Sequence, residues 1–253
     1  MKSKSLKTPL RYPGGKSRAC TKIESYFPDL SKYKEYREPF LGGGSVALYV
    51  TQKFPHLKIW VSDLYEPLIN FWQQLQSKGD ILSNALIKLK NKYPDQESAK
   101  RLFLDTKDMI NDEHYADIDR AIAFYIVNKC SFSGLTESSS FSQQASISNF
   151  SMNGIEKLTG YQELIVNWKI TNKSYEDLFS DSKQVFTYLD PPYEIKIIFM
   201  ERRVLCMTHS LMTTLLLSVI DMQVINLYLI ILLLLLKKDL EIGLRQSSHT
   251  LIP

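Results

Sequence analysis

Four consecutive residues, Asp190-Pro191-Pro192-Tyr193, could hold a planar amine for chemical attack. They follow an apolar run at 184–189 that predicts a buried strand. Pro192 has no N–H group, fixes its own φ and restricts Pro191 to extended conformations, so the loop is rigid. Asp190 and the bare carbonyl beside it can both accept from an exocyclic NH2 group, while Tyr193 stacks on the ring that carries it. An ordinary strand-to-loop turn is the alternative interpretation.

A second segment, residues 38–45, predicts a nucleotide pocket because a short strand enters three glycines and leaves as a helix. Glycines let the backbone approach a ligand that any Cβ would keep away. The segment is not the dinucleotide-binding Gly-x-Gly-x-x-Gly, and Glu38 would repel a pyrophosphate. An uncharged adenosine with a cationic amino-acid end fits better. Asp63 follows the next predicted strand, 58–62, where an acid can accept from ribose hydroxyls, although on its own it would be an N-cap for a helix over 64–75.

The third segment runs from Arg11 to Ser17 and contains Gly14-Gly15-Lys16. It ends like a P-loop, but the first glycine of that motif would fall at Leu10, and no strand precedes it. A nucleotide triphosphatase is therefore disfavoured. Apolar residues recur at helical spacing over 17–27, so we expect this segment to present a cation and backbone amides at the start of a helix.

The elements that must position these segments are strands, interrupted by a mainly helical insertion. Apolar residues recur at three and four positions between 80 and 127, among many charges. A polar segment rich in Ser and Gln follows at 136–151, and its composition alone favours a flexible surface loop. Residues 168–171 then predict a strand, and 175–179 a short helix.

The composition limits the kinds of partner and the cell compartment that we expect for this protein. The chain has 253 residues, a mass of 29.3 kDa, a net charge of +4 and a pI near 8.7, which permit a polyanionic partner without requiring one. Its three cysteines are widely spaced and form no metal-ligand pattern, which suits a reducing compartment. The basic N-terminus has no apolar core, so it does not read as a signal peptide. We therefore expect a cytoplasmic protein without a metal.

The three segments, in this order, resemble the signature blocks of the Dam/DpnM-type adenine-N6 DNA methyltransferases. The resemblance covers roughly residues 7–196. It implies a Rossmann-like α/β methyltransferase fold at 7–79 and 167–196, a helical DNA target-recognition insertion at 80–166, and S-adenosylmethionine as the methyl donor. It further implies double-stranded DNA as substrate, with the target adenine flipped out of the duplex. A cognate restriction endonuclease is a possible partner, and no membrane is expected.

The resemblance also implies roles for individual residues. The implied catalytic residues are Asp190, Pro191, Pro192 and Tyr193. Those expected to bind the cofactor are Tyr12, Lys16, Glu38, Phe40, Gly42, Gly44, Ser45, Asp63 and Asp190. Those expected to contact DNA are Arg11, Asn128, Lys129, Phe132 and Gly134. Many relatives that read GATC carry an arginine shortly after this last glycine, whereas Thr136 and Glu137 follow here, so the target sequence stays open.

The segment 197–253 departs from the pattern. Its apolar run at 224–236 has fewer residues than a membrane span needs. The run also lacks the alternation of apolar and polar residues expected of the remaining strands of the sheet. Loss of one base at the Lys196 codon would let residues 197–204 decode as Asp-Asn-Phe-Tyr-Gly-Lys-Lys-Gly, which resembles the family. The hypothesis is an out-of-frame tail, with an inactive remnant as the alternative function. A methyltransferase of RNA or of small molecules is a weaker alternative.

Overall fold

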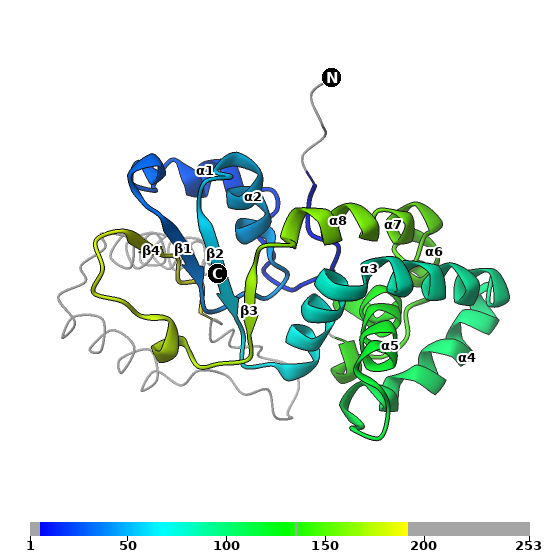
Figure 1. The fold of residues 1–253 in the computed structure, drawn as a ribbon. Helices are drawn as coiled ribbons and strands as arrows, with labels where there is room; N and C mark the ends of the chain where they lie inside the picture. Colours follow the sequence, from blue (N-terminus) through cyan, green and yellow to red (C-terminus); the bar gives the residue numbers. More distant parts are fainter. Residues whose placement is uncertain (1–5, 135, 192–253) are drawn as a thin grey trace, which may run out of the picture.

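The computed structural model describes residues 6–134 and 136–191 of the chain (Figure 1). Its four strands form one parallel sheet in the order β3-β2-β1-β4. Their bounds are β1 Glu35–Glu38, β2 Lys58–Ser62, β3 Lys169–Thr171 and β4 Val185–Thr187. The chain runs outward from β1 through β2 to β3 and then crosses back to place β4 on the other side of β1. The predicted Rossmann-like α/β fold is confirmed for the described residues.

The strands agree with the sequence to within a few residues. The second strand has the bounds that the apolar pattern predicts, and the third begins one residue later than expected. The fourth is shorter than the predicted run of 184–189. The Tyr188 N–H still donates to the carbonyl of Arg37 at 2.8 Å, and the chain then leaves the sheet towards Asp190 and Pro191. The shortening therefore lengthens the loop that carries the predicted catalytic segment.

Two of the first three helices, α1 before the first strand and α3 after the second, differ from the prediction at their ends. The predicted helix over 17–27 is reduced to α1 Cys20–Glu24, because the residues before it form turns, with Ala19 N donating to Lys16 O at 2.7 Å. The glycine loop leads into α2 Ser45–Lys53 as expected. The helix expected over 64–75 is α3 Glu66–Lys92 and is more than twice as long.

Helix α3 crosses the proposed boundary between catalytic part and insertion. Its one non-helical residue is Lys78, just before that boundary. At the next position a Cβ on Gly79 would lie 2.8 Å from the side chain of Gln162, whose Oε1 accepts from Asp80 N at 3.0 Å. The close approach of Gln162 therefore coincides with a kink, and the helix continues beyond it. The division of the chain into these domains stays a prediction.

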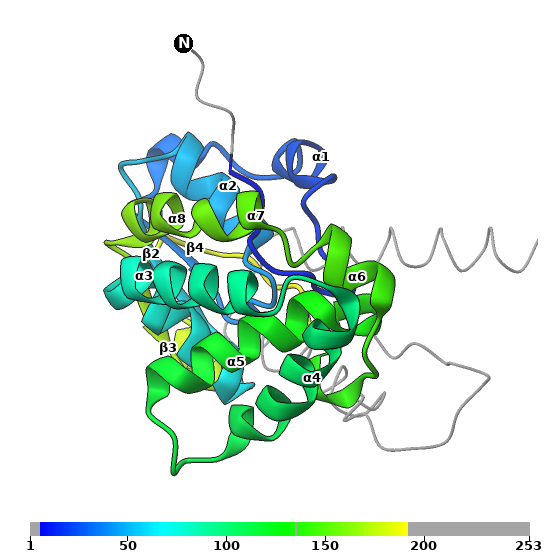
Figure 2. The same cartoon turned by 90° about the vertical axis from the view of Figure 1, so that its right-hand side faces the viewer.

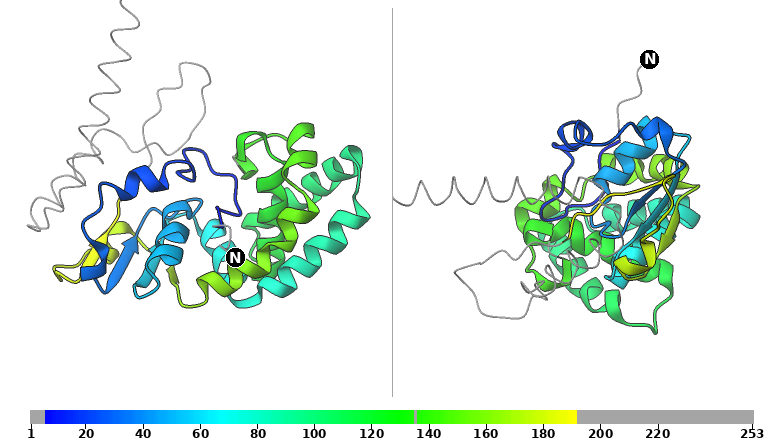
Figure 3. Two further views of the ribbon diagram at one scale, coloured as in Figure 1. Left: turned by 90° about the horizontal axis from the view of Figure 1, so that it is seen from above. Right: turned by 90° about the vertical axis from the view of Figure 1, so that its left-hand side faces the viewer.

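The insertion is helical as predicted. It contains α4 Gln96–Lys107, α5 Asp117–Cys130, α6 Gln143–Ser148, α7 Met152–Glu156 and α8 Leu158–Ile165, with short 3-10 turns between several of them. Helix α5 is buried along most of its length and packs against both α3 and α4 (Figure 2). Seen from above, the sheet lies at one end of the described chain and the green helices of the insertion at the other (Figure 3).

The interpretation of 136–151 as a flexible surface loop is wrong for half of its length. The Ser142 side chain accepts from Ala145 N at 3.2 Å and caps helix α6. Ala145 and Ser146 are buried, and the neighbouring Phe141 packs edge to face on Phe103 of α4, with ring centroids 5.6 Å apart. Polar composition concealed a capped helix that docks through two small residues and one aromatic ring.

The core joins the sheet to the insertion through the first half of α3. Trp72 lies beside Trp168, which precedes β3, with ring centroids 5.8 Å apart. One residue earlier, Phe71 stacks on Tyr125 of α5 at 5.9 Å. These side chains are buried, so the first half of α3 packs both against the residue before β3 and against helix α5 of the insertion. In the described part of the chain no helix has the length and apolar character needed to cross a membrane.

Candidate active site

The predicted site residues gather at the carboxyl ends of β1, β2 and β4. The strand order reverses between β1 and β4, and ligands of open parallel sheets bind beyond the strand ends at this point. The loop after β1 carries the glycines, the residue after β2 is Asp63, and the loop after β4 carries Asp190 and Pro191. Three segments far apart in sequence therefore meet at one edge of the sheet.

Two aromatic side chains enclose the glycine loop and explain why it needs glycines. A Cβ on Gly42, whose φ is +48°, would lie 2.8 Å from the ring of Tyr12, and one on Gly43 would lie 2.9 Å from its Cβ. On the other side a Cβ on Gly44, whose φ is +67°, would lie 2.8 Å from the ring of Trp72. The Trp72 indole also donates to the Gly42 carbonyl at 3.4 Å. Tyr12 and Trp72 thus fix the shape of the loop before any ligand binds.

Asp63 fastens this loop to the start of α3. Its Oδ2 accepts from Gly42 N at 2.9 Å, and its Oδ1 accepts from Tyr65 N at 3.1 Å. Helix α3 begins at Glu66 with Tyr65 at its N-cap, so the simple N-cap interpretation of Asp63 is wrong. Burial raises the pKa of Asp63, while the backbone N–H groups of Gly42 and Tyr65 act against that rise.

Lys16 forms an ion pair with the predicted catalytic acid. Its Nζ lies 2.7 Å from Oδ2 and 3.0 Å from Oδ1 of Asp190, and it also donates to the Gly14 carbonyl at 3.1 Å. A turn brings the lysine there, because Gly15 N donates to Tyr12 O at 3.0 Å and Gly14 has a φ of +74°. The segment that resembles a P-loop end thus delivers its cation to a carboxylate of the chain itself.

Glu38 lies in the core beneath the site. It is 2 % exposed and accepts from the Tyr36 hydroxyl at 2.7 Å. Burial raises the pKa of Glu38 to about 8; the Tyr36 hydrogen bond acts against this rise and the charge of Asp190 adds to it. The carboxyl is therefore largely protonated at neutral pH. Its role in cofactor binding stays a prediction.

The remaining predicted cofactor residues flank the loop. Phe40 stacks on Tyr175 with ring centroids 5.7 Å apart, and the hydroxyls of Ser17 and Ser45 lie 2.9 Å apart. Pro191 is buried at the end of the described chain. Pro192 and Tyr193 lie outside the described residues, as does the hypothesised out-of-frame segment 197–253.

Asn128 and Arg11, both predicted to contact DNA, are bonded to each other. The Asn128 side chain accepts from Arg11 N at 2.9 Å and donates to Arg11 O at 2.7 Å. Asn128 is fully buried, and the Arg11 guanidinium donates to the Ser131 carbonyl at 2.5 Å. Asn128 thus ties the segment that carries Tyr12 and Lys16 to the C-terminal end of α5. A direct contact of Asn128 with DNA stays a prediction.

The other predicted DNA-contacting residues lie at the C-terminal end of α5 and in the turn that follows it. Gly134 has a φ of +74°, and a Cβ there would lie 2.7 Å from Arg11, so the loop packs directly on it. Phe132 is 63 % exposed, which makes its ring available to a partner. The Lys129 ammonium lies 5.3 Å from the ring of Tyr125, and burial, reinforced by the charge of Arg11, lowers the pKa of Lys129 to about 8.

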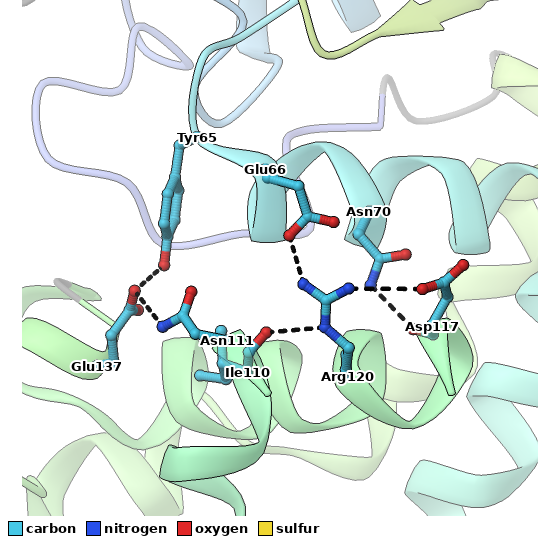
Figure 4. Close-up of polar contacts among 8 residues, drawn as sticks. All are labelled: Tyr65, Glu66, Asn70, Ile110, Asn111, Asp117, Arg120 and Glu137. Atoms are coloured by element: carbon cyan, nitrogen blue, oxygen red, sulfur yellow. Dashed lines mark hydrogen bonds and ion pairs between the residues drawn. The ribbon is translucent and has the colours of Figure 1, made fainter. Parts of the chain in front are cut away.

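Two polar groupings beside the site had no signal in the sequence. The buried Arg120 donates to the Ile110 carbonyl at 3.1 Å and forms an ion pair with Glu66 (Figure 4). Close by, the Tyr65 hydroxyl donates to Glu137 on the loop that follows α5. Each of these two contacts joins the start of α3 to the insertion. Their partners lie more than fifty positions apart in the sequence, so no local sequence pattern predicts them.

The arrangement can bind an adenosine-type ligand and hold an amine. The glycine loop and Asp63 occupy the places where parallel α/β sheets bind a nucleoside, and Asp190 offers a carboxylate across from them. Asp63 and Asp190 offer acceptor oxygens, which suit hydroxyl and amine donors better than a pyrophosphate. Among the described residues no cluster of His, Cys, Asp and Glu could hold a metal ion.

These features define a Rossmann-like α/β protein with a nucleotide-type site at the switch point of its sheet. Residues 12–205 match the D12 class of N6 adenine-specific DNA methyltransferases, so the chain belongs to this family. The family confirms the resemblance drawn from the three sequence blocks.

Curated relatives agree with this family. The type II methyltransferase M.MjaIII of Methanocaldococcus jannaschii is 28% identical over 202 residues, which cover 75% of this chain and 70% of the relative. The DNA N-6-adenine-methyltransferase of Escherichia phage P1 is 29% identical over 126 residues, or 50% of this chain and 15% of the relative. A DNA adenine methylase of Vibrio cholerae is 27% identical over 126 residues, or 50% of this chain and 42% of the relative.

Proposed function

We propose that this chain transfers a methyl group from S-adenosylmethionine to N6 of an adenine flipped out of duplex DNA. The observation that supports it best is the meeting of Asp190 and Pro191, at the end of β4, with the glycine loop of β1 at the switch point of the sheet. A base amine held by Asp190 and Pro191 would then lie next to a methyl donor held by the glycine loop.

The residues present fit S-adenosylmethionine. Asp63 would accept from the ribose hydroxyls, while Tyr12 and the glycine loop that it covers would contact the uncharged nucleoside. Asp190 and Lys16 would lie near the amino-acid end. When bound, the cofactor supplies an electrophilic methyl group, and no metal is required for that chemistry.

Asp190 and Pro191 would orient the attacking amine. Adenine N6 is a poor nucleophile because its lone pair is delocalised into the ring. The Asp190 carboxylate and the Pro191 carbonyl would accept its two hydrogens and direct the lone pair at the methyl carbon. As the nitrogen becomes cationic, the carboxylate stabilises the developing charge and is placed to take the proton that N6 releases. Tyr193 would stack on the base.

Duplex DNA would approach along Arg11 and the loop after α5. Arg11 and Lys129 are the cations there, and the exposed Phe132 offers a ring against which bases could stack. Since two relatives are named type II methyltransferases, a cognate restriction endonuclease acting on the same site is part of the proposal. We place the reaction in the cytoplasm, which also suits the free, buried Cys20 and Cys130.

Methyl transfer from labelled S-adenosylmethionine to unmethylated duplex DNA tests the proposal. We expect activity in the full chain and a loss of at least about 100-fold in Asp190→Ala, because an electrostatic contact to the reacting group is removed. Asp181→Ala is the matched control, since Asp181 is exposed and lies before β4. Equal activity of Asp190→Ala and Asp181→Ala would contradict the assignment.

A second version of the chain tests the hypothesis about its tail. In this version the residues after Lys196 are replaced by those encoded in the other reading frame. Activity found only in that version would identify this chain as an inactive copy of a methyltransferase. Activity in both would show that the tail does not disable the enzyme.

A further inference from the structure

We propose that Asn128 and Tyr65 are positioning residues that couple the binding of the methyl donor to the binding of DNA. Each side chain joins the loop after α5, residues 131–141, to a segment that would hold the cofactor. The inference rests on the proposed function. It names the two side chains through which one ligand would raise the affinity of the chain for the other.

The side chain of Asn128 is used entirely by the main chain of other residues. It lies in the last turn of α5 and is 0 % exposed. Its Oδ1 accepts from Arg11 N at 2.9 Å, and its Nδ2 donates to Arg11 O at 2.7 Å and to Gly134 O at 3.4 Å. Asn128 therefore acts on a ligand through Arg11 and Gly134, which it holds in place.

Arg11 leads directly into the segment 12–16, which would hold the methyl donor. The ring of the next residue, Tyr12, lies so close to the glycine loop that a Cβ on Gly42 would be 2.8 Å from it. At the end of the same segment, Lys16 Nζ lies 2.7 Å from Asp190 Oδ2. A fixed main chain at Arg11 thus fixes where this segment begins.

The loop after α5 rests on the same residue from the other side. The Arg11 guanidinium donates to the Ser131 carbonyl at 2.5 Å, and a Cβ on Gly134 would lie 2.7 Å from the Arg11 carbonyl oxygen. Between them, Phe132 is 63 % exposed. DNA that orders this loop would therefore also order Arg11.

Tyr65 supplies a second link between the two sites. Its hydroxyl donates to Glu137, near the far end of the loop (Figure 4). Its N–H donates to Asp63 Oδ1 at 3.1 Å, and Asp63 Oδ2 accepts from Gly42 N at 2.9 Å. The tyrosine ring also packs on Phe124 of α5, with centroids 6.1 Å apart. This link therefore ends on the same glycine loop that Tyr12 covers.

Two sites that share their supports bind their ligands cooperatively. A ligand that orders a segment loses free energy in doing so, and a second ligand that needs the same order loses less. The effect is reciprocal, so the methyl donor strengthens DNA binding by the factor by which DNA strengthens binding of the methyl donor.

The dissociation constant of an unmethylated duplex, measured by fluorescence anisotropy with and without S-adenosylhomocysteine, tests the inference without catalysis. The nucleoside is added at a concentration that saturates each variant, so the ratio of the two constants reports the coupling alone. For the wild type we expect DNA to bind at least about 5-fold more tightly with the nucleoside. Asn128→Ala and Tyr65→Phe should each bring this ratio closer to one.

Tyr161→Phe is the matched control. The Tyr161 hydroxyl donates to the carbonyl of Lys7, so it also holds the chain before Arg11, but from α8 and without a link to the loop after α5. Its removal should leave the ratio as in the wild type. A ratio that falls equally in Tyr161→Phe would show a general effect of stability and overturn the inference, as would a wild-type ratio in both Asn128→Ala and Tyr65→Phe.

Hydrogen exchange of the Arg11 amide in the wild type reads the same contact without any substitution, should Asn128→Ala fail to fold. S-adenosylhomocysteine and the duplex should each slow this exchange, and an amide that neither ligand protects further would overturn the inference. Methyl transfer to the same duplex keeps the two proposals distinct. Coupled binding without methyl transfer would refute the proposed function alone, and methyl transfer with a wild-type ratio of one would refute the coupling alone.

Discussion

Glu38→Gln provides a sensitive test of the electrostatics beneath the site. The carboxyl is 2 % exposed, and the groups that face it are the Tyr36 hydroxyl, Asp190, Lys16 and the Cys20 thiol. Burial raises the pKa of Glu38 to about 8, from the ordinary 4.5. Glutamine has the same shape but cannot ionise, so the substitution removes the titration and keeps the packing.

The direction of the pH dependence follows from the protons that Glu38 binds in the folded and unfolded states. Between pH 4.5 and 8 the unfolded chain releases a proton from Glu38 that the folded chain retains. The free energy of unfolding therefore falls as pH rises through this window. Each pH unit well inside the window costs about 1.4 kcal/mol, so from pH 5 to pH 7 the wild type loses about 2.5 kcal/mol relative to Glu38→Gln.

Urea denaturation of both proteins at pH 5 and pH 7 measures this difference. Glu113→Gln serves as the control, because Glu113 is exposed. Its unfolding free energy should stay at a constant offset from that of the wild type. A difference between wild type and Glu38→Gln that does not change with pH would refute the argument, since Glu38 would then ionise alike in both states.

Two other substitutions test the contacts around the segment 11–16. Gly42→Ala should lower the free energy of unfolding by about 1–3 kcal/mol more than Gly14→Ala, because only the first Cβ meets the ring of Tyr12, while both positions have positive φ; equal effects would contradict the close packing. Asn128→Ala leaves the backbone N–H and carbonyl of Arg11 without their partners and should cost at least about 2 kcal/mol in denaturation; a stability within a few tenths of wild type would show that water replaces the side chain.

The sequence predicted the strands and glycine turns well because their signals are local. Residues 58–62 contain three consecutive apolar residues and are followed by Asp63, and three consecutive glycines after a short strand predict a turn. The three blocks and their order also predicted the family, which the match over residues 12–205 confirms. Helix ends were predicted less well, because capping and kinks depend on residues from elsewhere, such as Gln162 beside Gly79.

The amino-acid sequence by itself indicated the fold class and the family, because these rest on three short blocks of characteristic residues in a fixed order. The roles of Asp190 and of S-adenosylmethionine stay predictions. Tertiary structure alone decided that Lys16 pairs with Asp190, that Tyr12 and Trp72 enclose the glycines, and that Tyr65 anchors Glu137. Those contacts join residues that lie dozens of positions apart. They exist because the parallel sheet brings the ends of its strands to one edge and because α3 packs against both the sheet and α5.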